Sequence, residues 1–244
     1  MGYLGNVRPT IALVADDITD GAVTSAKIAA DAVTSAKIGA NQIGNSELDL
    51  TAAYAFTGTV TGAGGLVALN TTTASNSANV QWSDTLITDT YNDYIIIGRG
   101  VIPATDAQKL NFLISINGGS NYSIDVSSGM TYEDLETAAG GTVNLDGDGD
   151  QDVSNGEIPM ARGLGNDANQ GASFIIHCIG FRETAAIKHC FMTTVGTHSS
   201  NPGNNYMWKT GSRIETQSAI NHMRVEFASG NITEGKVTLF GVKS

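Results

Sequence analysis

The start of the chain carries apolar residues at a spacing of five. The heptapeptide AVTSAKI occurs at residues 22–28 and again at 32–38. A step of five matches neither the period of a helix, about 3.6 residues, nor the two-residue period of a strand. A lone helix or strand would therefore spread these residues over more than one face. The residues in this series are Leu13, Ile18, Val23, Ile28, Val33, Ile38, Ile43 and Leu48.

Two architectures would bury this series together. One is a single-chain solenoid that turns a corner every five residues, and the other is a shaft in which segments of three chains wind about one axis. The repeat region has residues for only about two solenoid coils, too few for a continuous core. We therefore predict an intertwined trimeric shaft over residues 16–55, built around the eight apolar residues. The solenoid and a disordered tether are the alternatives.

The pattern changes after the repeats. The glycine-rich segment FTGTVTGAGGLV at 56–67 predicts a hinge. Short apolar or alternating segments between turn clusters then predict at least eight strands, and TYEDLETAAGG at 131–141 predicts at most a turn or two of helix. The fold class is mainly β, with residues 68–244 forming a jelly-roll-like β-sandwich. The predicted strands lie at 66–73, 79–83, 93–102, 109–117, 173–181, 187–195, 222–228 and 236–243.

Composition agrees with this fold class and narrows the range of partners. Hydrophobic residues make up 41%, enough for a sizeable core, whereas charged residues make up only 15%. The 29 glycines suit many turns between strands. The net charge of -11 argues against a nucleic-acid groove, because phosphate binding requires a basic face.

The apolar runs and the N-terminus indicate the compartment in which the chain is made. No apolar run approaches the roughly 20 residues of a membrane helix, and the N-terminus lacks the basic and apolar regions of a signal peptide. We therefore expect synthesis in a cytoplasm and no membrane insertion.

Cys178 and Cys190 lie six residues on either side of Thr184, so a hairpin centred there would place them opposite each other. We expect buried free thiols.

Three segments resemble tail fibre and tail appendage proteins of tailed bacteriophages. They are DGAVTSAKIAADAVTSAKI at 20–38, YNDYIIIGRGVIPATDAQKLNFLISINGGSNY at 91–122, and INHMRVEFASGNITEGKVTLFGVKS at 220–244. The resemblance implies a homotrimer in the virion tail, made in the host bacterial cytoplasm. It also implies docking to a tail hub, nozzle or adaptor protein through residues 1–15. The C-terminal domain would then contact a host-surface glycan or protein.

The short shaft leaves other functions open. A head decoration or tail-hub accessory protein would also fit, and a host-glycan hydrolase is a further alternative. We predict no enzymatic activity, because the four histidines lie beside no serine elbow, HExxH or paired Cys-His motif. We also expect no required cofactor.

The segment DGDGDQDVSNGE at 146–157 is a candidate calcium loop. Its oxygen-bearing side chains fall at positions 1, 3, 5, 7, 9 and 12 of a twelve-residue loop, a spacing that converges oxygens on a hard cation. Position 6 holds Gln151 where a glycine is usual. The alternative is an acidic surface loop. The candidate ligands of a structural Ca²⁺ are Asp146, Asp148, Asp150, Asp152, Ser154 and Glu157.

The segment SSNPGNNYMWKTG at 199–211 is a candidate receptor loop. It combines amide side chains with aromatic rings, as sugar-binding sites do. The alternative is that the two aromatic residues share one face of a strand and pack in the core. The candidate residues are Asn201, Asn204, Asn205, Tyr206 and Trp208.

Overall fold

The computed structural model divides the chain into two compact units, residues 1–61 and 62–244. The division falls inside the predicted hinge. The described residues are 21–24, 26, 28–29, 32–34, 37–38, 65–135, 143–145, 151–153, 156–200 and 203–243.

In the first unit the described part of the repeats changes direction at a regular interval. The backbone bends at Val23, Ile28, Val33 and Ile38, the four described members of the apolar series. Their side chains are 40 to 57% exposed in the single chain. The five-residue spacing is therefore present in the local structure, and the apolar side chains are left uncovered. The trimeric shaft stays a prediction, and the other members of the series, Leu13, Ile18, Ile43 and Leu48, lie outside the described residues.

The second unit is a β-sandwich of two antiparallel sheets, which confirms the mainly-β fold class. Its described residues contain no helix. The strands are β1 (Leu66–Ser77), β2 (Val80–Trp82), β3 (Asp93–Pro103), β4 (Gln108–Ser115), β5 (Val126–Asp134), β6 (Val143–Leu145), β7 (Gln151–Val153), β8 (Glu157–Leu164), β9 (Ala172–Ile179), β10 (Lys188–Thr197), β11 (Asn205–Ile214), β12 (His222–Phe227) and β13 (Ile232–Val242).

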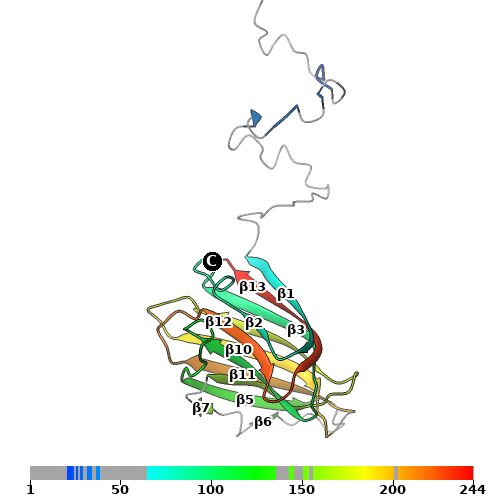
Figure 1. The fold of residues 1–244 in the computed structure, drawn as a ribbon, viewed down its shortest axis with the longest axis vertical. Helices are drawn as coiled ribbons and strands as arrows, with labels where there is room; N and C mark the ends of the chain where they lie inside the picture. Colours follow the sequence, from blue (N-terminus) through cyan, green and yellow to red (C-terminus); the bar gives the residue numbers. More distant parts are fainter. Residues whose placement is uncertain are drawn as a thin grey trace, which may run out of the picture. The chain divides into compact units, whose positions relative to one another are not determined.

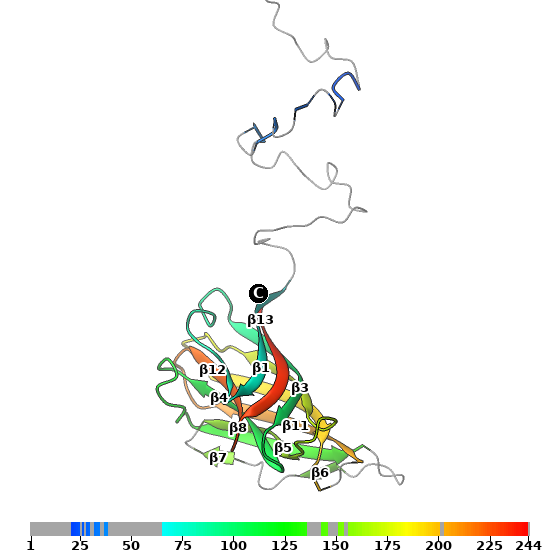
Figure 2. The ribbon, with the colours of Figure 1, turned by 45° about the vertical axis from the view of Figure 1, so that its right-hand side comes forward.

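The strand order is that of an extended jelly roll. Eight strands form the two series β1-β13-β3-β9 and β2-β12-β4-β8, so that the first strand pairs with the last and the second with the one before the last. The insertions β5–β7 and β10–β11 widen the first series into a nine-stranded sheet, here called the large sheet. Figure 1 shows β1, β13 and β3 at one edge of this sheet and β5 to β7 at the other, and Figure 2 shows β12, β4 and β8 as a second layer.

All eight predicted strand segments are strands, namely β1 to β4, β9, β10, β12 and β13. The predicted helical turn at 131–141 is wrong in its described part, because Thr131–Asp134 complete β5. Pairing with β11 holds this segment extended, with Tyr132 opposite Trp208. Strands β5, β6, β7, β8 and β11 were not predicted.

The core lies between the two sheets and is filled by large side chains from both. Trp82, Tyr94, Phe112 and Phe181 are fully buried, and the rings of Phe112 and Phe181 stack at 6.4 Å. This packing fixes the relative position of the sheets and of the loops that join them.

Cys178 and Cys190 lie directly opposite each other on β9 and β10, as the hairpin predicts. Both are buried free cysteines. Burial raises the pKa of the Cys190 thiol to about 12 and raises the pKa of Cys178 well above its ordinary value. Both thiols are therefore protonated and unreactive at neutral pH.

The two ends of the large sheet differ. At one end, here the near end, the chain enters at Leu66, which lies opposite Val242, and the Lys243 N–H donates to the Gly65 carbonyl at 2.7 Å. The opposite end, here the far end, holds the last residue of β3, Pro103, and the last residue of β10, Thr197. The chain therefore enters and leaves the sandwich at the near end.

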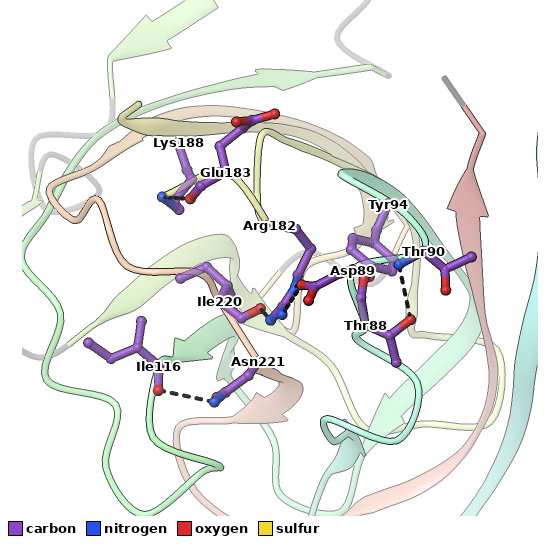
Figure 3. Close-up of polar contacts among 10 residues, drawn as sticks. All are labelled: Thr88, Asp89, Thr90, Tyr94, Ile116, Arg182, Glu183, Lys188, Ile220 and Asn221. Atoms are coloured by element: carbon purple, nitrogen blue, oxygen red, sulfur yellow. Dashed lines mark hydrogen bonds and ion pairs between the residues drawn. The ribbon is translucent and has the colours of Figure 1, made fainter. Parts of the chain in front are cut away.

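Polar contacts fix the loops of the near end (Figure 3). Arg182 forms an ion pair with Asp89 and donates from Nη1 to the Ile220 carbonyl at 2.9 Å. Asn221 donates to the Ile116 carbonyl at 3.0 Å. These contacts join loops that are far apart in the sequence, so the loops of the near end are held to one another.

Candidate functional site

A cleft of about 400 Å³ opens at the far end of the large sheet. The ends of β3, β9 and β10, residue Glu234 of β13, the start of β11 and the loop between β8 and β9 line it. We call it the far-end cleft. It lies at the opposite end of the sheet from Leu66, where the chain enters.

Two irregularities open the sheet at this point. The pairing of β3 with β9 shifts between Gly98 and Val101, and the pairing of β13 with β3 shifts on both sides of Glu234. Gly100 lies in the β3 bulge with a φ of 57°, and its N–H donates to the Ser173 hydroxyl at 3.2 Å. Bulges bend strands and change the direction of their side chains. The far-end cleft is therefore a consequence of the shifts in strand pairing.

The loop between β8 and β9 forms a fixed wall. The buried Gln170 accepts the Asp167 N–H on its Oε1 at 3.2 Å, and the Gln170 N–H donates to the Asp167 carbonyl at 2.8 Å. A Cβ at Gly196 would lie 2.8 Å from the Gly171 carbonyl, so the loop approaches β10 as closely as glycine allows. The wall is therefore preformed.

Polar and apolar side chains both line the floor and rim of the cleft. Ser173 and Val195 lie opposite each other on β9 and β10 and are both exposed. Asn169 and Glu234 are also exposed, and neither side chain has a hydrogen bond or ion pair with another described residue. Glu234 is the single carboxylate among the described lining residues, which include no Lys or Arg.

The predicted receptor segment is divided between the core and the surface. Trp208 is 2% exposed, and the half-buried Tyr206 stacks on it at 5.8 Å, because both face the core from β11. The Asn204 amide donates to Asp134 at 3.1 Å. Of the described candidates, Asn205 lines the far-end cleft, where it accepts a hydrogen bond from Thr197. Asn201 lies outside the described residues.

The predicted calcium loop falls largely outside the described residues, as Asp146, Asp148, Asp150 and Ser154 do. Asp152 lies in β7, and Glu157 begins β8. Gln151 also lies in β7, opposite Ser128, so this part of the segment is a strand. No group of three acidic, His or Cys side chains suited to a metal occurs in the described part of the chain. The Ca²⁺ site stays a prediction.

Three of the histidines, His177, His198 and His222, make ring contacts. His222 is buried, and its Nδ1 lies 2.9 Å from the Tyr122 hydroxyl, while the Arg224 guanidinium lies 3.9 Å above the Tyr122 ring. Burial, and then the charge of Arg224, lower the pKa of His222. His177 stacks on Phe191 at 4.5 Å. These arrangements hold neighbouring segments together.

The outer face of the large sheet is a second candidate surface. Phe191, Ile179 and Val195 are 39 to 48% exposed on β9 and β10. Beside them on the same face lie the half-buried Ile95, Ile97, Ile175 and Phe240. An antiparallel sheet usually presents polar residues to water on its outer side, so this face, here the apolar face, is suited to packing against another surface.

Sequence reasoning missed the cleft residues Asn169, Gln170, Ser173 and Glu234. A signal was present, because Gly98 and Gly100 interrupt the apolar segment at 93–102, and a glycine inside a strand pattern indicates a bulge. The residues that meet at this bulge come from distant segments, and no local pattern joins them.

Among the described residues, no helix is long and apolar enough to cross a membrane. Comparison with protein-family models, with curated proteins and with solved structures finds no match for the chain.

Proposed function

We propose that the protein is a structural virion protein, a short homotrimeric tail fibre of a tailed bacteriophage. Residues 1–15 dock to the tail hub, nozzle or an adaptor protein, and the sandwich contacts the host surface. One observation carries the proposal: the chain that follows the five-residue repeats enters a jelly roll at the near end, and a cleft opens at the far end of the same sheet.

The proposed mechanism is multivalent binding. The far-end cleft is open to solvent, which suits weak contacts. Three domains on one shaft, and several fibres on one particle, convert weak contacts into strong attachment, since each later contact is intramolecular. No chemical step is needed.

The repeats support the trimer on physical grounds. Val23, Ile28, Val33 and Ile38 are exposed in the single chain although their spacing is regular. Apolar residues in register gain free energy when partner chains cover them, at about 25 cal/mol for each Å² removed from water. Three chains about one axis supply that cover.

Gold-labelled antibodies raised against residues 62–244 test this proposal on particles of the phage that encodes the chain. We expect label at the tail. Label spread over the head would contradict the fibre and favour a decoration protein, and unlabelled particles would contradict any virion role.

The apolar face favours a second candidate, a head decoration or tail-hub accessory protein. In that role Phe191, Ile179 and Val195 would pack flat on another virion protein. A pull-down with purified tail-hub and major head proteins separates the two candidates, because a fibre binds the hub through residues 1–15. A variant with Phe191→Lys keeps hub binding if the chain is a fibre and loses binding if the apolar face is the contact.

We propose no glycan-cleaving role. Glycoside hydrolysis commonly uses two carboxyl groups on either side of the scissile bond. The described lining of the far-end cleft provides Glu234 alone. Release of reducing sugar from host envelopes would contradict this proposal.

A further inference from the structure

We propose that the far-end cleft binds a neutral saccharide through the side chains of Asn169, Gln170, Ser173 and Glu234. This inference rests on the proposed host-recognition function, and it specifies the class of ligand and the residues that hold it.

Hydrogen-bonding groups of both kinds converge on the cleft. Gln170 uses its Oε1 to accept the Asp167 N–H, which leaves its Nε2 group to donate. Ser173 uses its oxygen to accept the Gly100 N–H, which leaves its O–H to donate. Glu234 accepts only, and the Asn169 amide both donates and accepts. Sugar hydroxyls each donate and accept, so a ring with several hydroxyls matches this mixture.

The charge of the described lining disfavours anionic ligands. The described lining contains no Lys or Arg to pair with a phosphate, sulfate or uronic acid, and the Glu234 carboxylate repels each of them. A single carboxylate is also too few for a dedicated calcium site, which takes six to eight oxygen ligands. The ligand that fits is uncharged and polar.

The position of the cleft in the sheet argues against an extended peptide. Strands β3, β9 and β10 each have a neighbour on both sides, so they present no free edge for strand addition. A sugar ring instead needs polar groups around its rim and an apolar contact beneath its C–H bonds. Val195 is 39% exposed on the floor of the cleft and offers that contact.

The cleft also keeps its shape before a ligand arrives. The hydrogen bonds between Gln170 and Asp167 fix the wall, and the close approach at Gly196 fixes the loop against β10. Binding therefore costs little free energy for ordering the cleft, which favours a polar ligand of low affinity.

Saturation-transfer difference NMR on the full chain tests the inference with four neutral sugars. These are methyl α-D-glucopyranoside, methyl α-D-galactopyranoside, methyl α-L-rhamnopyranoside and N-acetyl-D-glucosamine, with sodium glucuronate as the anionic comparison. We expect at least one neutral sugar to bind and glucuronate to bind more weakly. In the double variant Asn169→Ala/Glu234→Ala the affinity falls on the order of tenfold, because two hydrogen-bonding groups are lost.

The matched control is Asp125→Ala/Gln217→Ala, which removes an exposed carboxylate and an exposed amide from the near end. We expect it to bind as the unchanged chain does. Melting curves of both double variants check that each is folded.

Three results would overturn the inference: no neutral sugar binds, glucuronate binds best, or the two double variants bind equally well. Its failure is separable from failure of the proposed function. A trimer found on phage tails that binds none of the sugars refutes the cleft inference alone. A monomer absent from virions whose sugar binding depends on Asn169 and Glu234 refutes the fibre alone.

Discussion

At the scale of single residues, Lys188 shows how the near end is held together. Its side chain is fully buried, and its Nζ donates to the carbonyls of Glu183, Ala186 and Thr216 at 2.7, 3.0 and 3.2 Å. The first of these contacts is drawn in Figure 3. Burial lowers the pKa of Lys188, because desolvation disfavours its charge. The ammonium joins the β9–β10 turn to the segment that follows β11.

Replacing this lysine removes the ammonium donor, so the three carbonyls that accept from it lose that hydrogen bond. We expect Lys188→Met to lower the free energy of unfolding by about 2–4 kcal/mol, since unsatisfied buried polar groups are costly. Urea denaturation followed by tryptophan fluorescence measures the change. Lys209→Met, at an exposed position of β11, is the control and should change stability by about 0.5 kcal/mol or less. Equal stabilities for the two variants would refute the proposed role of Lys188.

At the scale of elements, a glycine and an aromatic ring fit β3 to β9. Gly98 lies opposite Phe174, and a Cβ at Gly98 would lie 2.2 Å from the Phe174 ring. The ring occupies the space that any larger residue at 98 would need. The irregular pairing that opens the far-end cleft begins directly after this contact.

We expect Gly98→Ala to destabilise the sandwich by about 1–3 kcal/mol, because the methyl group overpacks the core. Gly211→Ala is the matched control, since a Cβ at Gly211 meets nothing within 4 Å and its backbone does not require glycine. Thermal unfolding should show a lower Tm for Gly98→Ala and an unchanged or higher Tm for Gly211→Ala. The opposite order would mean that Phe174 has room to move.

The eight predicted strands share a property that sequence reasoning can detect, an apolar or alternating run between turns. The missed strands lack it. Strand β5 reads VSSGMTYED, and β8 contains Pro159, which is tolerated because β8 is the edge of its sheet. These segments are strands because neighbours pair with them, as Tyr132 pairs with Trp208. Long-range pairing of this kind leaves no local period in the sequence.

At the scale of the whole molecule, the sequence predicts a sandwich preceded by repeats but does not predict the cleft. Of the described residues of the candidate receptor segment, Asn205 lines the cleft. Its aromatic residues turned inward because β11 alternates core and outer positions, which places Trp208 in the core. The remaining cleft residues come together only through the bulges of β3 and β13.

The proposed trimer depends on the apolar series of the repeats. We expect Ile28→Asp to abolish the trimer, because the substitution buries three charges near one axis. Thr24→Asp is the control, since it adds the same charge in the same repeat away from the five-residue series. Analytical ultracentrifugation compares the two variants. A trimeric Ile28→Asp variant would show that another part of the chain holds the three copies together.

The most direct test of the account is the mass of the unchanged full chain in solution, measured by light scattering after size-exclusion chromatography. The account predicts a single species with three times the 25.3 kDa mass of one chain. A stable monomer of 25.3 kDa at micromolar concentration would contradict it.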